Sequence, residues 1–117
     1  ALARRTQRLD DLERILRAPL FERFHYVNEA VKDTAGVQEM LSFWASWWRD
    51  VLLCAAGDES FLVNVDRRAA LRSYAQSYGV RTSAAVLNDL RDTSKYIERN
   101  ANARLALEVL MLDLPAL

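Results

Sequence analysis

The chain has 117 residues, and its 16 lysine and arginine side chains are balanced by 16 aspartate and glutamate side chains. A domain that binds nucleic acid directly usually carries an excess of positive charge, so this balance argues against DNA as its main direct partner. Hydrophobic residues make up 51% of the chain and charged residues 27%, the ordinary mixture of a globular protein. No apolar run approaches the ~18 residues needed to span a bilayer, so no membrane partner is expected.

The length suits a single domain over residues 1–117. The chain begins with Ala1 rather than methionine, and the residues that follow already have a helical pattern, so we expect a fragment of a longer protein. Its single cysteine, Cys54, cannot form an internal disulfide bond, which fits a reducing compartment and predicts a cytoplasmic protein.

Glycine and proline divide the sequence into blocks of helical length. The breaks fall at Pro19, Gly36, Gly57, Gly79 and Pro115. No block shows the sustained two-residue alternation of a strand. The sequence therefore predicts an all-α fold, an antiparallel helical bundle of five or six helices.

The first two expected helices, residues 4–17 and the segment after Pro19, each have one apolar face. Apolar residues recur in both at the three- and four-residue spacing of a helix. They are Leu9, Leu12 and Leu16 in the first helix, and Leu20, Phe24, Val27 and Val31 in the second. Gly36 is expected to end this region.

The third expected helix, residues 37–56, is apolar around most of its circumference. A helix with so wide an apolar surface needs neighbours on two sides, so we place it at the centre of the fold. Its three tryptophans, Trp44, Trp47 and Trp48, recur at helical spacing and are interpreted as core residues. Gly57 is expected to end the helix, since glycine adopts a left-handed backbone at little cost.

The segment after Gly57 has an irregular pattern, and its apolar residues are expected to close one end of the core. These residues are Phe61, Leu62, Val63 and Val65. Asp66 is expected to cap the fourth helix, because its carboxylate can accept hydrogen bonds from free backbone amides. Gly79 should end that helix.

Two more helices are expected, the fifth capped by Thr82 or Ser83 and the sixth by Asn102. The sixth is apolar on most faces. Its apolar residues are Leu105, Leu107, Val109, Leu110, Met111, Leu112 and Leu114, which leaves Arg104, Glu108 and Asp113 for solvent. We expect part of this surface to be covered by another chain as well as by the core.

The sequence offers no cluster of reactive side chains, so no catalytic residue, cofactor, metal ion or small-molecule substrate is expected. His25 is the only histidine, and there is no cysteine pair to complete an ordinary zinc site with it. Cys54 lies in an apolar run, where a thiol is inert. Arg49 and Asp50 leave two alternatives open: partners on an adjacent helix or in water, or a role in fixing the loop after Gly57.

Two stretches resemble the C-terminal domain of the delta-prime subunit of the bacterial DNA polymerase III clamp loader. The first is "WWRDVLLCAAGDESFLVNVDRRAALRSYA", which matches the family pattern W-x-R-D-x-L-L followed by N-x-D. Its motif residues are Trp47, Arg49, Asp50, Leu52, Leu53, Asn64 and Asp66. The second, "ERNANARLALEVLMLDLP", is similar to the family's closing motif through Asn100, Asn102 and Arg104, with Ala103 where the family usually has proline. The resemblance is specific over about the last 70 residues.

The resemblance implies a helical collar domain within a longer subunit that also carries two N-terminal domains of the AAA+ ATPase type. In the family, five such helical domains pack side by side as a collar, which holds the pentamer together while the ATPase domains load the sliding clamp onto primed DNA. Delta prime is a rigid stator there and does not hydrolyse ATP. The expected partners are therefore the gamma/tau and delta subunits, with DNA involved only indirectly.

A subunit held between two neighbours needs apolar patches besides its core, and the last helix is expected to supply one. The candidate interface residues are Val109, Met111 and Leu112, with Arg104 and Glu108 beside them.

Three alternatives remain open from the sequence. The chain could be a gamma/tau collar domain, or a free-standing helical adaptor that uses its tryptophan-rich helix to line a ligand pocket. It could also bind DNA through a mild basic stripe, which comprises Arg91, Lys95, Arg99 and Arg104. Asp92 and Glu98 interrupt that stripe, so a salt-bridged helix face is the preferred interpretation.

Overall fold

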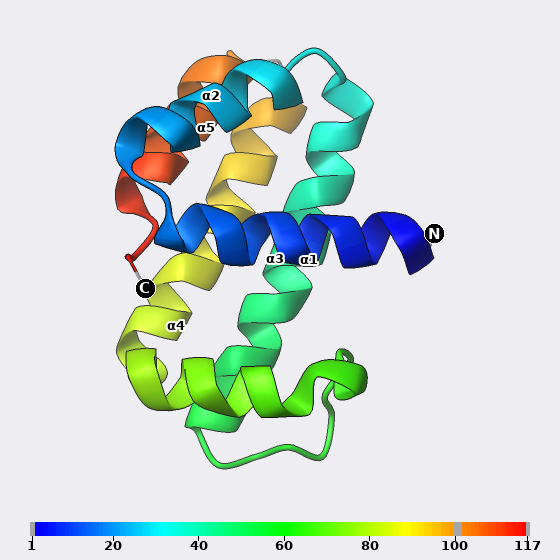
Figure 1. The fold of residues 1–117 in the computed structure, drawn as a ribbon, viewed down its shortest axis with the longest axis vertical. Helices are drawn as coiled ribbons and strands as arrows, with labels where there is room; N and C mark the ends of the chain where they lie inside the picture. The colour runs from blue at the N-terminus through cyan, green and yellow to red at the C-terminus, as the bar shows by residue number, and fades with distance from the viewer. Residues whose placement is uncertain (1, 100–101, 117) are drawn as a thin grey trace.

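The computed structural model describes residues 2–99 and 102–116, and within them it is helical with no strand. Figure 1 shows the arrangement. The helices are α1 (Leu2–Arg17), α2 (Leu20–Ala30), α3 (Thr34–Ala55), a short 3₁₀ helix η1 (Val65–Arg67), α4 (Arg68–Glu98) and α5 (Ala103–Asp113). The predicted all-α bundle is confirmed. Asn100 lies outside the described residues.

Helix α3 is the centre of the fold, as its wide apolar surface predicts. It packs against α1, α2 and α4, and α1 crosses it in Figure 1. Trp44, Trp47 and Trp48 are all buried, which confirms them as core residues. Trp44 also donates a hydrogen bond from Nε1 to the carbonyl oxygen of Arg8, 2.8 Å away, so it joins α3 to α1 by more than apolar contact.

Helix α4 is bent sharply at Gly79, where the backbone has φ 73° and ψ −177°. Only glycine adopts this region readily, so the predicted break at Gly79 is confirmed. The prediction of a cap at Thr82 or Ser83 is wrong, because helical structure resumes directly after Gly79. Ser83 instead donates from its hydroxyl to the Gly79 carbonyl oxygen, 2.7 Å away.

Two other helix boundaries, the end of α3 and the start of α5, lie where the sequence predicts them. Gly57 has φ 83°, and its N–H donates to the Cys54 carbonyl (3.1 Å) while that of Asp58 donates to Leu53 (2.9 Å). This pair of bonds is the Schellman motif, which satisfies carbonyls left free at a helix C-terminus. The Asn102 side chain accepts from the Leu105 amide at 3.1 Å, so Asn102 caps α5 as predicted.

The start of α3 differs from the prediction. Gly36 does not end the preceding region but lies in the first turn of α3, which begins at Thr34. The cap is Asp33, whose carboxylate accepts from the Gly36 amide at 3.1 Å. An aspartate cap supplies an acceptor for a free amide, which outweighs the modest cost of glycine inside a helix.

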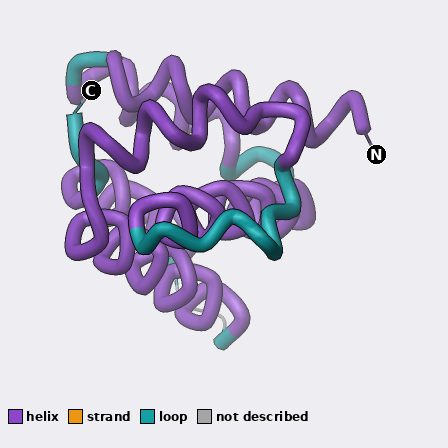
Figure 2. Tube along the Cα trace, turned by 90° about the horizontal axis from the view of Figure 1, so that it is seen from below, coloured by secondary structure: helices purple, strands orange, loops and turns teal. Residues whose placement is uncertain are grey.

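The loop between α3 and α4 does not close the core with its apolar residues. Figure 2 shows it as a long non-helical stretch beside the start of α4. Phe61, Val63 and Val65 are exposed, Phe61 by 70%, and only Leu62 is partly buried against the core. Asp66 lies within η1 and does not cap α4, whose preceding residue, Arg67, makes no capping bond either.

Candidate functional site

Helix α5 has two apolar faces, and the core covers one of them. The buried face comprises Leu107, Leu110 and Met111, and Leu114 just after the helix extends it. The outer face is a stripe of three aliphatic side chains that are Leu105 (60% exposed), Val109 (48%) and Leu112 (59%). We call these three residues the outer stripe. Their spacing of four and three residues places them on one side of the helix.

The structure divides the predicted interface residues. Val109 and Leu112 are exposed, and Leu105 joins them although the sequence reasoning did not choose it. Met111 is fully buried, so it is not a surface residue and that part of the prediction is wrong. It lies on the core face because it follows Leu107 by one helical turn.

The two polar candidates lie to one side of the outer stripe, toward α2. Arg104 is exposed, and its guanidinium donates to the side-chain oxygen of Asn28 on α2. Glu108 is half-buried. Arg104 therefore helps to hold α5 against α2, with which α5 is in contact.

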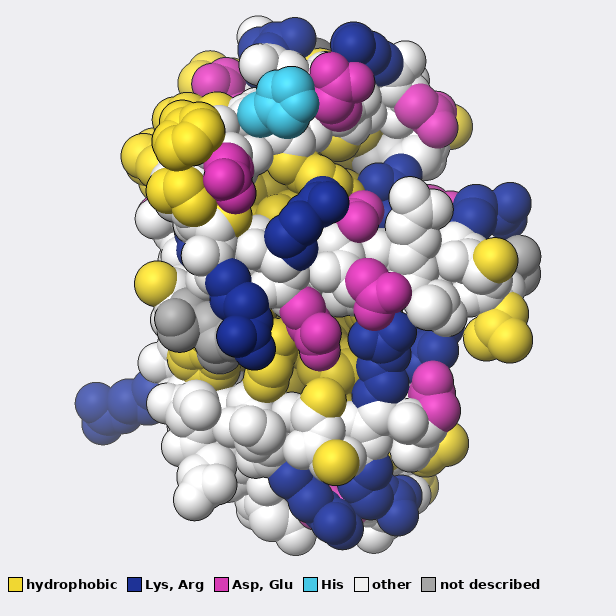
Figure 3. Space-filling model, viewed as in Figure 1, with side chains coloured by type: hydrophobic (Ala, Val, Ile, Leu, Met, Phe, Trp, Pro, Cys, Tyr) yellow, Lys and Arg dark blue, Asp and Glu magenta, His cyan; other side chains and the backbone are white. Residues whose placement is uncertain are grey.

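Further exposed apolar side chains lie near the contact between α2 and α5. Figure 3 shows hydrophobic side chains gathered over the start of α2, where the exposed residues are Leu20 and Phe21. Isolated exposed apolar residues are normal in a monomer, whereas groups of them mark interaction sites.

A groove of about 310 Å³ lies between α4 and α5, next to the outer stripe. Its apolar walls include Leu105 and Val109 from α5 and Tyr96, which is 59% exposed, from α4. Its acidic residues are Asp89 and Asp92 of α4 and Asp113 of α5. We call these three the acidic rim; the sequence reasoning did not single them out as a group.

The acidic rim carries charge that is not neutralised within the described part of the chain. None of its three carboxylates forms an ion pair with a described lysine or arginine. Burial raises the pKa of Asp89, and the neighbouring charges of Asp113 and Asp92 raise it further. The groove therefore combines apolar walls with a local excess of negative charge.

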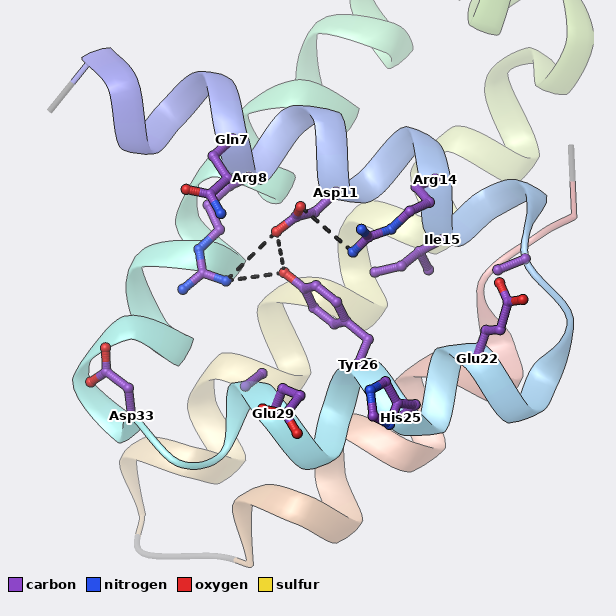
Figure 4. A pocket seen from close by; sticks show the side chains of 12 residues that line it. Gln7, Arg8, Asp11, Arg14, Ile15, Glu22, His25, Tyr26, Glu29 and Asp33 are labelled. Atoms are coloured by element: carbon purple, nitrogen blue, oxygen red, sulfur yellow. Dashed lines mark hydrogen bonds and ion pairs between the residues drawn. The ribbon is translucent and has the colours of Figure 1, made fainter.

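A second, more polar cleft of about 550 Å³ lies between α1 and α2 (Figure 4). The Tyr26 hydroxyl donates to Asp11 Oδ2 at 2.7 Å and accepts from Arg8 at 3.0 Å. Arg14 lies 3.7 Å from the other Asp11 oxygen. Burial, followed by the Asp11 carboxylate, raises the pKa of Tyr26, so the phenol stays protonated at neutral pH. These groups satisfy one another, and the arrangement joins the two helices without an activated nucleophile.

The motif residues after Trp47 form a network that holds the loop between α3 and α4. Asp50 is fully buried and accepts from the amides of Val63 (3.0 Å) and Asn64 (2.7 Å) and from the Asn64 side chain (2.8 Å). Arg49 donates to the Phe61 carbonyl at 3.3 Å. Of the two alternatives left open for Arg49 and Asp50, the role in fixing the loop is therefore the one that the contacts support.

The same network reaches α1. Asn64 is buried, and its side-chain oxygen accepts from Arg5 Nη2 at 2.6 Å. Arg5 also pairs with Asp66 at 2.9 Å, and this interaction lowers the pKa of Asp66. Asp66 thus binds an arginine of α1 instead of capping α4. The residues of the motif W-x-R-D…N-x-D therefore hold together three segments of the chain, which are α3, the loop after it and α1.

One buried residue that sequence reasoning missed is Arg23, on the inner side of α2. It is 5% exposed and donates to the carbonyls of Ile15 (3.0 Å), Met111 (2.8 Å), Leu114 (2.9 Å) and Pro115 (3.0 Å). From the sequence alone an arginine beside apolar residues is expected to be exposed. Only the fold shows that Arg23 is buried and joins α1, α2 and α5.

The described residues contain neither a candidate metal site nor a helix that could span a membrane. No three histidine, cysteine, aspartate or glutamate side chains there come together as a metal site. Within the same ranges no helix is long and apolar enough to cross a lipid bilayer. Burial raises the pKa of the Cys54 thiol, which disfavours the reactive thiolate.

The exposed outer stripe is the kind of surface that a partner chain covers. Comparison with protein families agrees: the family described as "DNA polymerase III, delta subunit, C terminal" matches residues 1–115. The chain belongs to this clamp-loader family. Comparison with curated proteins and with solved structures finds no match. The delta-family match supports a clamp-loader domain, as the motifs predict, but does not separate delta from delta prime.

Proposed function

We propose that the chain is a collar domain, which holds a clamp-loader subunit against its neighbours and takes no part in chemistry itself. The observation that carries this proposal is the outer stripe of α5, because three aliphatic side chains on one exposed helix face are costly unless a partner covers them. The family match names the kind of assembly. Residues 1–117 would then be one helical domain of a longer cytoplasmic AAA+-type subunit.

The finer assignment that we propose is delta prime, with gamma/tau and delta as the neighbours in the collar. It is supported by the resemblance of the two motif stretches, and by the way in which Asp50, Asn64 and Asp66 of the first stretch act together in one network. A delta-prime subunit should complete a mixture that contains gamma/tau and delta. A delta subunit should instead complete a mixture that contains gamma/tau and delta prime.

The test is assembly of the full-length subunit with gamma/tau and delta, followed by size exclusion with light scattering. The variant Val109→Glu places a charge on the outer stripe and should prevent or strongly weaken incorporation. Val80→Glu is a matched control, since Val80 is 47% exposed and lies on α4 outside the groove. Circular dichroism of both variants checks that the fold is intact. Equal incorporation of both variants would contradict the proposed placement of the interface.

A further inference from the structure

The α4–α5 groove has a chemistry of its own that a general role in assembly does not specify. Its apolar walls, Tyr96, Leu105 and Val109, can take up aliphatic side chains, and the groove is continuous with the outer stripe through the last two. The acidic rim surrounds these walls from both helices. An apolar site bordered by charge of one sign selects partners by the opposite charge as well as by shape.

The acidic rim is unfavourable in the chain on its own. Asp89 and Asp92 are three residues apart on α4, and carboxylates at this spacing on a helix repel each other. Asp113 adds a third negative charge from α5. Lysine or arginine side chains from a partner would turn these repulsions into attractions. A phosphate backbone would increase them, so nucleic acid does not suit this groove.

Among the described residues, the exposed cations of α4 form no ion pair with the acidic rim. Arg91 and Lys95 line a different hollow, which lies between α3 and α4. Leu41 of α3 and Leu90 of α4 also line it. The two cations do not line the α4–α5 groove, so a second copy of the chain would have to present them from a different part of its surface, in a head-to-tail arrangement. The occupant that fits best belongs to a different subunit.

We propose that the α4–α5 groove binds a segment of a neighbouring subunit that carries aliphatic side chains flanked by lysine or arginine. This inference rests on the proposed role in subunit assembly and adds the chemistry of the partner. The aliphatic side chains lie against Leu105 and Val109. The flanking cations pair with the acidic rim, which gives the contact its orientation and makes its formation depend on salt.

The experiment measures binding of the full-length subunit to immobilised gamma/tau and delta at low and at high ionic strength. Asp92→Asn/Asp113→Asn removes two rim charges without changing side-chain shape. The control Glu22→Gln/Glu29→Gln changes the net charge equally on exposed residues of α2. At low salt the rim variant should bind roughly tenfold more weakly, with little remaining salt dependence, as expected for the loss of two exposed ion pairs. The control should behave as wild type.

A second variant separates the apolar part of the contact from the charged part. Leu105→Ser should weaken binding at both ionic strengths and leave the salt dependence unchanged, because it alters only the apolar wall. If the rim variant binds as wild type does at both ionic strengths, the inference is overturned while the proposed function stands. If the wild-type subunit does not assemble with gamma/tau and delta, the proposed function fails and the inference with it. Salt-dependent self-association that the rim variant abolishes would assign the groove to a second copy and overturn the inference.

Discussion

Replacement of Arg23 by methionine should destabilise the domain more than any surface substitution. The guanidinium donates four hydrogen bonds at 2.8 to 3.0 Å, and three of them are buried. The Ile15 carbonyl keeps a second donor in the Ala18 amide. The Met111 carbonyl does not have the usual helical donor four residues later, because that residue is Pro115 and has no N–H. Arg23 supplies the missing donor.

The magnitude follows from the carbonyls that would be left unpaired. Two buried carbonyls, those of Met111 and Leu114, lose the donor that Arg23 provides, at about 1–3 kcal/mol each. Removal of a buried cation that has no carboxylate partner among residues 2–99 and 102–116 offsets part of this loss. The net decrease in the free energy of unfolding should therefore be about 2–4 kcal/mol, a large share of the ~5–15 kcal/mol that holds a domain of this size together.

Thermal unfolding followed by circular dichroism measures the effect. A loss of about 2–4 kcal/mol corresponds to a decrease in Tm of roughly 8–16 °C for a chain of this length. Arg23→Lys should give an intermediate loss, because an ammonium group keeps the charge but lacks the planar fork of donors. Arg17→Met, on the exposed side of α1, is the control and should change Tm by no more than about 2 °C. A Tm for Arg23→Met as high as that of the control would refute the reasoning.

Three further substitutions test other parts of the structure. Gly79→Ala should lower the stability by about 1–3 kcal/mol, measured by urea unfolding, through backbone strain alone, since beyond the adjoining residues and helix backbone nothing lies within 4 Å of the added methyl group. Asp50→Leu should speed amide hydrogen exchange at Val63 and Asn64 much more than in the core of α3, because both amides lose their acceptor; equal protection in variant and wild type would show that the loop is held by other contacts. Asp89→Asn should stabilise the isolated domain by about 0.2–0.5 kcal/mol at neutral pH. The pKa of Asp89 is raised in the native state, so its charged form costs stability above that pKa, and the cost disappears as the pH falls through it. The difference in Tm between wild type and Asp89→Asn should therefore shrink in acid, and a constant difference would contradict this assignment of the charge.

Local signals in the sequence predicted the helices and several of their ends. Gly57, Gly79 and Asn102 each act through their own backbone or side chain within a few residues, so no tertiary contact is needed to place them. Asp66 shows the limit of such signals. Its carboxylate could cap a helix, but Arg5 lies close enough in the fold to bind it instead.

The sequence could not decide which apolar residues face the core where apolar residues occur on more than one side. On α5, Leu107, Leu110, Met111 and Leu114 make a consistent helical face, and so do Leu105, Val109 and Leu112. Both patterns have the same period, and only the positions of α2 and α4 determine which is covered. The exposure of the loop residues Phe61 and Val63 could not be predicted from their own pattern either, because it depends on contacts with α3. Arg49 donates to the Phe61 carbonyl and Asp50 accepts from the Val63 amide, and both side chains of the loop residues are exposed.

The contacts of Arg23 also bear on the order in which the domain can be completed during synthesis. Its acceptors on α5 and beyond follow it in the chain by 88 to 92 residues. A nascent chain that emerges with its N-terminal end first has therefore made α1 to α4 before these acceptors exist. Until then the guanidinium lacks three of its four carbonyl acceptors, and only that of Ile15 is available to it. Completion of the fold thus waits for the final turn of α5 to leave the ribosome.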